Sequence, residues 1–133
     1  MAGKLAPDHL LFTIGGFFGT SYQISWAEGR LWYIWRPQGG EVSREALSPS
    51  EEEWERFWTQ LDQLRAWKWD GRYENPSVLD GTSWGLEILR DGKELECSGR
   101  NAYPPDGKGP SMPRQFRRFL QALSMLIGGR ELY

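Results

Sequence analysis

The chain has 133 residues, a formal net charge of -2 and a pI near 5.5. This length is typical of a single domain, so we expect one α+β domain over residues 1–133. The acidic balance argues against nucleic acid as the main partner, because binding to phosphates requires clustered positive charge. No apolar run approaches the ~18 residues that span a bilayer, so we expect no association with a membrane.

The chain has one cysteine, Cys97, and one histidine, His9, and this limits its chemistry. One cysteine cannot form an intrachain disulfide, and one histidine cannot provide the several converging ligands of a histidine metal site. Pro7 and Asp8 interrupt the apolar run that a signal peptide would need. We therefore expect a cytoplasmic protein that uses no metal and no cofactor.

The first part of the chain predicts three strands. Residues 10–14 are a short apolar run that a glycine pair ends, which is typical of a buried strand. Residues 22–26 and 31–36 flank a turn at residues 27–30 and so predict a hairpin. The return strand is apolar on both faces. It is therefore either central in the sheet or in contact with another chain through Trp32 and Ile34.

Two helices are predicted by their periodicity. The first begins at Ser48-Pro49-Ser50-Glu51, where Pro49 would occupy the first helical position and Ser48 and Glu51 would form a capping box. The second runs over residues 112–127, before a glycine pair. Apolar residues at spacings of three and four give each helix one buried stripe. In the first helix this stripe contains Trp54, Phe57, Trp58, Leu61 and Leu64.

Between the helices lies the clearest hairpin signal of the chain. Residues 86–90 and 94–98 flank Asp91-Gly92, and an Asp-Gly pair suits a tight turn because both positions require positive φ. The predicted order is therefore β-β-β-α-β-β-α. The economical arrangement is a five-stranded antiparallel sheet with two helices packed on one face.

This hairpin also predicts a candidate site. The segment before its first strand and the segment after its second must lie side by side, opposite the turn. Aromatic walls with a few polar groups are typical of a pocket for a small polar ligand. An alternative is that the rings form a satellite core that only holds two loops in place. The candidate ligand-binding residues are Trp69, Arg72, Tyr73, Asp80, Trp84, Arg100, Asn101 and Tyr103.

The same segments carry a resemblance. Trp67-Lys68-Trp69, Asp80-Gly81-Thr82-Ser83-Trp84 and Gly99-Arg100-Asn101-Ala102-Tyr103-Pro104 resemble the pattern of a family of small bacterial proteins of uncharacterised function. The resemblance covers about the C-terminal two thirds of the chain. It implies a single stand-alone domain, and it implies no activity, cofactor or catalytic residue.

We therefore expect a non-enzymatic binding or interaction domain, with a protein partner or a small polar ligand at the aromatic end of the sheet. The alternative is a small hydrolase in which Asp70 and Asp80 act as acid and base. A homodimer through the face with Trp32 and Ile34 is a third interpretation. The scarcity of catalytic residue types favours binding over catalysis.

Overall fold

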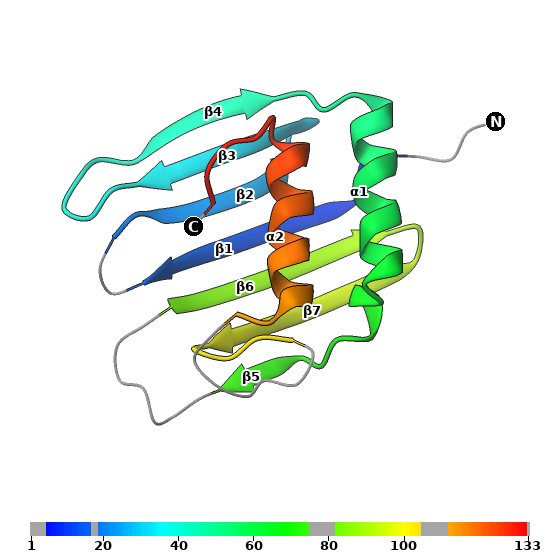
Figure 1. The fold of residues 1–133 in the computed structure, drawn as a ribbon. Coiled ribbons are helices and arrows are strands. Elements are labelled where there is room, and N and C mark those ends of the chain that lie inside the picture. The colour runs from blue at the N-terminus through cyan, green and yellow to red at the C-terminus, as the bar shows by residue number, and fades with distance from the viewer. Residues whose placement is uncertain (1–4, 17–18, 75–81, 105–111, 133) are drawn as a thin grey trace.

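The computed structural model describes residues 5–16, 19–74, 82–104 and 112–132, and in it two helices cover one face of a seven-stranded sheet (Figure 1). The order across the sheet is β4-β3-β2-β1-β6-β7-β5. Neighbouring strands are antiparallel except for β5 and β7, which are parallel. The strands are β1 (His9–Gly16), β2 (Ser21–Ala27), β3 (Arg30–Arg36), β4 (Ser43–Leu47), β5 (Arg72–Glu74), β6 (Thr82–Arg90) and β7 (Lys93–Arg100).

The predicted α+β class and the two helices are confirmed, and the sheet prediction is partly right. The five predicted strands are present and antiparallel, but the sheet has seven strands because β4 and β5 were missed. Both lie at edges of the sheet. β4 reads Ser-Arg-Glu-Ala-Leu and buries no residue fully, so it lacks the apolar alternation that reveals a strand. β5 has only three residues and pairs on one side with β7. Such short edge strands form because they pair with a neighbouring strand, and their sequences lack the alternation of apolar residues that would predict them.

Helix α1 (Glu51–Gln63) begins two residues later than predicted. Its N-cap is Ser50, whose hydroxyl accepts a hydrogen bond from the backbone N–H of Glu53, while the Glu53 carboxylate accepts one from the N–H of Ser50. The predicted box from Ser48 to Glu51 is therefore wrong. The reason is that Leu47 still pairs with Leu31 in the sheet, so the chain needs the next two residues to leave the strand.

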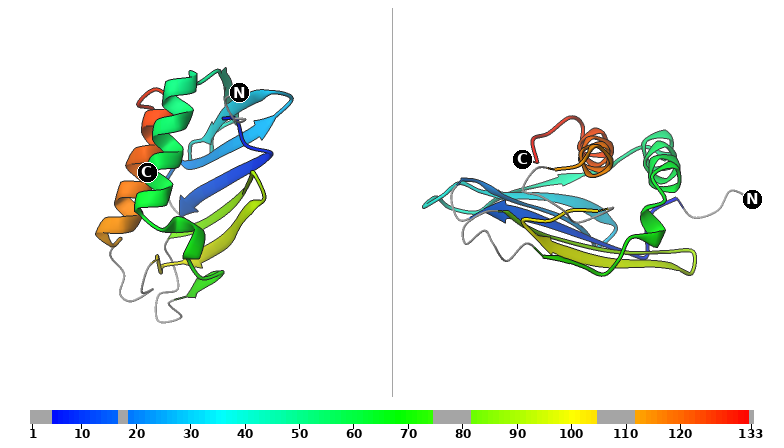
Figure 2. Two further views of the ribbon diagram at one scale, coloured as in Figure 1. Left: turned by 90° about the vertical axis from the view of Figure 1, so that its right-hand side faces the viewer. Right: turned by 60° about the horizontal axis from the view of Figure 1, so that its bottom comes forward.

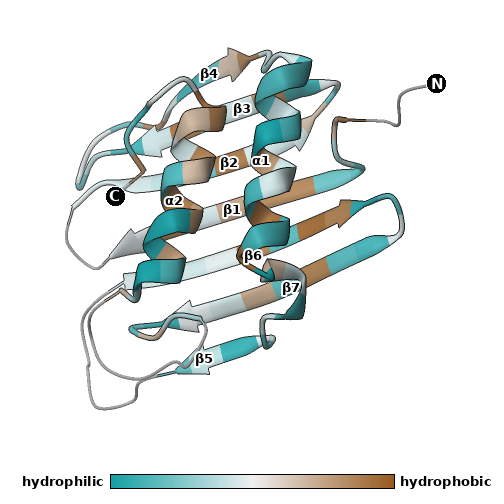
Figure 3. Cartoon of the chain, turned by 45° about the vertical axis from the view of Figure 1, so that its right-hand side comes forward, coloured by the Kyte–Doolittle hydropathy of each residue, from teal (hydrophilic) through white to brown (hydrophobic). Residues whose placement is uncertain are grey.

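The core lies between the sheet and the helices. Figure 2 shows α1 and α2 (Arg114–Leu126) on the same side of the sheet. Figure 3 shows apolar residues in the strands beneath the helices and in the helices themselves. Alternate strand residues such as Phe12, Ile24 and Leu86 point toward the helices and are almost completely buried. The helices contribute Phe57 and Phe119, among others, from their apolar stripes. No helix in the described part of the chain is long and apolar enough to cross a membrane.

The opposite face of the sheet has no helix over it, as the edge-on view in Figure 2 shows. We call it the open face. It consists of the strand residues that alternate with the buried ones, for example Leu11, Thr13 and Gln23. Trp32 and Ile34 also lie on this face and are only half-buried. The strand that carries them, β3, pairs with β2 and β4 and is one strand from the edge of the sheet.

The segment after α2 folds back onto β3 and β4. Arg130 forms two hydrogen bonds with the Glu45 carboxylate, at 3.0 and 2.7 Å, and Leu132 is buried. The Tyr33 hydroxyl donates a hydrogen bond to the backbone carbonyl of Glu131. Burial is the main cause that raises the pKa of Tyr33 above its ordinary value of 10.0, and the nearby Tyr22 and Glu131 add to it. This hydrogen bond therefore needs a protonated phenol.

Replacing Tyr33 with phenylalanine should lower the free energy of unfolding by about 1 kcal/mol, because the ring stays but the hydrogen bond to Glu131 is lost. The folded state raises the pKa of this phenol, so its stabilising contribution is fully present below pH 10.0 and is lost as the pH rises through the folded pKa. The variant should therefore lose less stability than the wild type between neutral and strongly alkaline pH. Urea titrations at several pH values measure this, and equal losses in the two proteins would contradict it.

Candidate functional site

The structure brings together the aromatic candidates Tyr73, Trp84 and Tyr103, and it buries them. Each is at most 6% exposed. The Trp84 ring lies 6.1 Å from the ring of Tyr73, 6.4 Å from that of Tyr103 and 4.8 Å from that of Phe116 on α2, between ring centroids. Trp69 is partly buried and packs against Phe116 at 6.5 Å. These rings, which we call the aromatic plug, fill the space between the sheet and the start of α2.

Hydrogen bonds fix the plug in place. The indole Nε1 of Trp84 donates to the carbonyl of Ala102 at 2.9 Å. The Tyr73 hydroxyl accepts a hydrogen bond from the backbone N–H of Asp70, also at 2.9 Å. Polar atoms of Trp84 and Tyr73 are therefore already used within the fold. Rings that are this deeply buried have little surface left for a ligand, which agrees with the satellite-core alternative.

Asn101 joins the ends of the two long strands β6 and β7. Its side-chain oxygen accepts a hydrogen bond from the N–H of Thr82, and its own N–H donates to the carbonyl of Thr82, both at 2.9 Å. The residue has a φ of 54°, a left-handed conformation that asparagine tolerates better than most residues. Asn101 is 6% exposed. It therefore closes the hairpin at the end opposite the turn.

The charged candidates are separated from the plug. Arg72 and Arg100 are exposed and lie on the open face, where Arg72 contacts Glu74 at 3.2 Å. Asp70 is exposed at the end of the segment before β5. Asp80 lies outside the described residues. The structure therefore gives no separation between the carboxylates of Asp70 and Asp80, which the hydrolase alternative requires. The ligand-binding role of the eight candidates stays a prediction.

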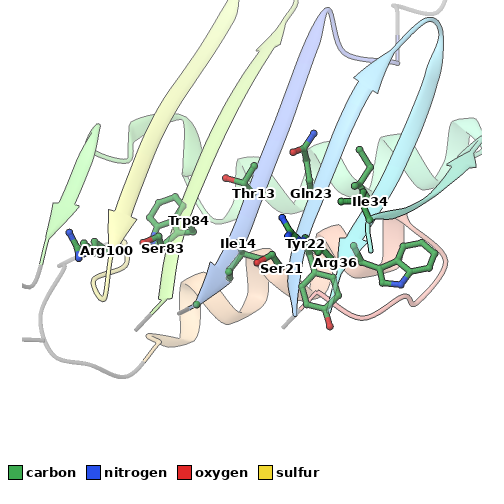
Figure 4. Close-up of a pocket in the computed structure, with 14 residues that line it drawn as sticks. Thr13, Ile14, Ser21, Tyr22, Gln23, Ile34, Arg36, Ser83, Trp84 and Arg100 are labelled. Atoms are coloured by element: carbon green, nitrogen blue, oxygen red, sulfur yellow. The ribbon is translucent and has the colours of Figure 1, made fainter. Parts of the chain in front are cut away.

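A hollow lies on the open face, at the end of the sheet where β6 begins and β7 ends. Its volume is about 640 Å³, within the range of ~300–1,000 Å³ that is usual for ligand pockets. Figure 4 shows labelled side chains of β1, β2, β3, β6 and β7 around it, with the helices behind the sheet. Its polar lining comes mainly from Thr13, Ser21, Gln23, Arg36, Ser83 and Arg100.

Small side chains line the centre of the hollow. Gly15 of β1 lies between Ser21 of β2 and Ser83 of β6, which are its neighbours across the sheet. A Cβ on Gly15 would lie 2.5 Å from the hydroxyl oxygen of Ser21, closer than real Cβ atoms approach, and 3.0 Å from its Cβ. Gly85 follows on β6, paired with Thr13. Glycines and serines on adjacent strands therefore form a depression between larger side chains on either side.

The hollow is electropositive. Arg36 lies on one side of it, on β3, and Arg100 lies on the other side, on β7. None of the described residues that line it is acidic. The chain as a whole, by contrast, has a net charge of -2. The lining also provides hydroxyl and amide groups from Ser21, Ser83 and Gln23, which donate hydrogen bonds to oxygen atoms.

Cys97 and His9 cannot act together. Cys97 points toward the helices and is 3% exposed, whereas His9 lies on the open face beside Glu87, with 3.6 Å between Nε2 and Oε1. Burial raises the pKa of the Cys97 thiol to about 12, so it stays protonated and weakly nucleophilic at neutral pH. The described residues thus contain no pairing of this cysteine with this histidine.

Sequence reasoning missed the hollow, although it did identify Arg100 and Trp84, which line it. The missed signal was the small residues on alternating positions of adjacent strands, such as Gly15, Ser21 and Ser83. Reading that signal requires the register between β1, β2 and β6, which follows from long-range pairing.

No model of a protein family matches the chain. No curated protein matches its sequence either. The resemblance of the tryptophan-rich segments to a family of small bacterial proteins therefore stays a prediction.

Proposed function

We propose that this protein is a non-enzymatic binding domain that holds a small anionic ligand in the hollow of the open face. The observation that carries the proposal is the electropositive lining of the hollow, with Arg36 and Arg100 on either side and no described acidic residue between them. The proposed site lies at the same end of the sheet as the predicted aromatic cluster. The ligand, however, would contact the face of the sheet opposite the buried rings.

The groups around the hollow suit oxyanions. Arginine offers a planar fork of donors that matches carboxylate and phosphate groups, and its charge is independent of pH in the neutral range. Ser83 is the antiparallel partner of Arg100, so a hydroxyl and a guanidinium come from adjacent strands. Ser21 is the corresponding partner of Arg36. Each side of the hollow therefore combines one cation with one hydroxyl donor.

The aromatic plug has a supporting role in this proposal. Trp84 lies on β6 between Ser83 and Gly85, so its burial on the helix side fixes the strand whose other face forms part of the hollow. The hydrogen bond from its indole to Ala102 also holds the chain just after Arg100. A rigid plug behind the sheet should keep the two sides of the hollow at a fixed separation.

Thermal unfolding in the presence of pyrophosphate tests the proposal. We expect the Tm to rise with pyrophosphate concentration and to rise less with sodium chloride at the same ionic strength, because a ligand that binds only the folded state stabilises it. In Arg36→Gln and Arg100→Gln the rise should be largely lost. Both side chains are exposed, so these variants should fold normally.

Arg56→Gln is the matched control, because Arg56 is exposed on α1, in the layer on the other side of the sheet. It removes the same charge and should keep the full rise in Tm. If pyrophosphate, inorganic phosphate and citrate all fail to stabilise the wild type more than chloride does, the proposal is wrong. It is also wrong if Arg56→Gln loses the effect as completely as Arg100→Gln.

A further inference from the structure

The charges on the open face are sorted by strand. On β3 and β4 the charged residues of this face are all arginines, whereas β6 and β7 carry glutamates there, with Arg100 at the loop end. The registers place these residues on one face. Arg44 pairs with Ile34, which pairs with Gln23 of the open face, and Glu96 pairs with Glu87, which pairs with Leu11 of the same face. The basic half has Arg30, Arg36 and Arg44, and the acidic half has Glu87, Glu94 and Glu96.

Between these halves lies a band that is nearly free of charge. It is formed by the open-face residues of β1 and β2, which are small, hydroxylic, apolar or, at Gln23, an uncharged amide, apart from His9 at the end of β1. Large apolar side chains flank the band, with Trp32 and Ile34 on β3 and the 38% exposed Leu89 on β6. Besides His9, the residues of the band are Leu11, Thr13, Gly15, Ser21, Gln23, Ser25 and Ala27.

We infer that the open face packs against the open face of a second copy of this chain. The two copies would be related by a twofold axis that runs parallel to the strands, above the seam between β1 and β2. Rotation about this axis places β3 of one copy over β6 of the other and β4 over β7. Each basic half then meets an acidic half, except at the end with the hollow, where Arg36 of one copy comes over Ser83, beside Arg100 of the other. By symmetry each of these contacts occurs twice.

The charge pattern selects this axis over the alternative. A twofold axis perpendicular to the strands would place β3 over β3 and β7 over β7. Arginines would then oppose arginines, and glutamates would oppose glutamates, which is unfavourable. The seam between β1 and β2 is also the position at which the uncharged band of one copy covers the band of the other.

The sizes of the side chains that would face each other across the interface are also complementary. Ile34 pairs with Gln23, and Gly85 pairs with Thr13, on opposite sides of the seam at the same level of the sheet. The axis therefore sets Ile34 of one copy against Gly85 of the other, a large side chain against a small one. On the outer strands, Arg44 comes over Ser98, one alternate position from Glu96. Side chains of this length can bridge two sheets packed ~10 Å apart.

The area is sufficient for a stable dimer. Six overlapping strands at ~4.8 Å spacing, each with ~7 residues at ~3.3 Å, cover roughly 700 Å² per copy. Stable interfaces of standard size bury about 800 Å² per partner. The second copy would also cover the hollow, so an anion bound there would be held between two sheets. Dimer and ligand are nevertheless separate claims, because Arg44 and Glu96 do not line the hollow.

Sedimentation equilibrium of charge-reversal variants tests this inference. The wild type should be a dimer at micromolar concentrations. Arg44→Glu and Glu96→Arg should each raise the dimer dissociation constant by roughly tenfold or more, since each substitution places like charges together twice. The double variant Arg44→Glu/Glu96→Arg should dimerise like the wild type again, because the reversed pair attracts. Arg56→Glu on α1 is the control and should remain dimeric.

The inference is wrong if the wild type stays monomeric at high concentration, or if the double variant stays monomeric although circular dichroism shows it folded. It is also wrong if reversal of Arg56 dissociates the dimer as strongly as reversal of Arg44. Loss of the pyrophosphate effect in Arg100→Gln with an intact dimer would support the ligand site independently. A dimer without any anion effect would leave the interface standing and contradict only the proposed ligand.

Discussion

Replacing Phe116 with alanine should lower the free energy of unfolding by about 3–5 kcal/mol, the largest effect that we expect of any single truncation in this chain. Phe116 is fully buried at the centre of the aromatic plug, with its ring centroid 4.8 Å from that of Trp84 and 4.9 Å from that of Tyr103. Its removal leaves a cavity that these rigid neighbours cannot fill. Chemical denaturation followed by tryptophan fluorescence measures the loss.

Met125→Ala is the matched control on the same helix, because Met125 is 56% exposed. It should change the free energy of unfolding by well under 1 kcal/mol. A loss of less than about 1 kcal/mol for Phe116→Ala would mean that the plug is loosely packed. In that case the plug, and not the open face, would again be the better candidate for a ligand pocket.

Replacing Gly99 with alanine should be nearly as damaging, although it adds only one methyl group. A Cβ at this position would overlap the indole Nε1 of Trp84 and the carbonyl oxygen of Ala102, and it would lie 2.7 Å from Cε2 of Trp84. These are the two groups that form the buried hydrogen bond of the plug. Overpacking costs typically ~1–3 kcal/mol, and loss of this hydrogen bond adds to it.

Gly85→Ala gives the comparison for this substitution. Gly85 lies on the neighbouring strand β6, and a side chain at this position would point toward the open face. The nearest atom to an added Cβ would be the hydroxyl oxygen of Thr13, at 3.3 Å. That side chain can rotate away. We expect a change in the midpoint of urea unfolding several times larger for Gly99→Ala than for Gly85→Ala. Equal changes would show that Trp84 can move, against a rigid plug.

The elements that the sequence predicts well are those whose signal is local. The Asp91-Gly92 turn and the apolar stripes of both helices depend on residues a few positions apart, and each is present. The predicted gathering of the two hairpin arms is present as well, because Ser83 pairs with Arg100. Strand pairing beside a tight turn leaves no other arrangement for those arms.

The features that the sequence did not predict depend on long-range pairing. β5 pairs with β7, whose residues lie more than twenty positions later in the chain. The three residues Arg72–Glu74 have no pattern that predicts a strand. The predicted capping box from Ser48 to Glu51 is wrong for the same reason: Leu47 still pairs in the sheet, so the helix is capped at Ser50 by the box with Glu53. The hollow likewise exists only because small residues of three strands come into register.

The two faces of the sheet differ in burial and in charge. The helix side holds the rings and the buried thiol and contributes stability. The open side has the exposed arginines and hydroxyls, and it has no helix to cover it. Binding residues on a sheet backed by a packed core are positioned more rigidly than residues on loops. We therefore propose that the open face recognises the ligand and that the plug supports it.

The most direct test is an NMR titration of the amide signals of the wild type with pyrophosphate, against chloride at equal ionic strength. We predict that the largest changes in amide chemical shift occur at Gly15, Ser21, Ser83 and Arg100, which line the hollow. Changes concentrated at the indole signals of Trp69 and Trp84, with the amides of Gly15 and Ser21 unmoved, would place the ligand at the plug and contradict the account.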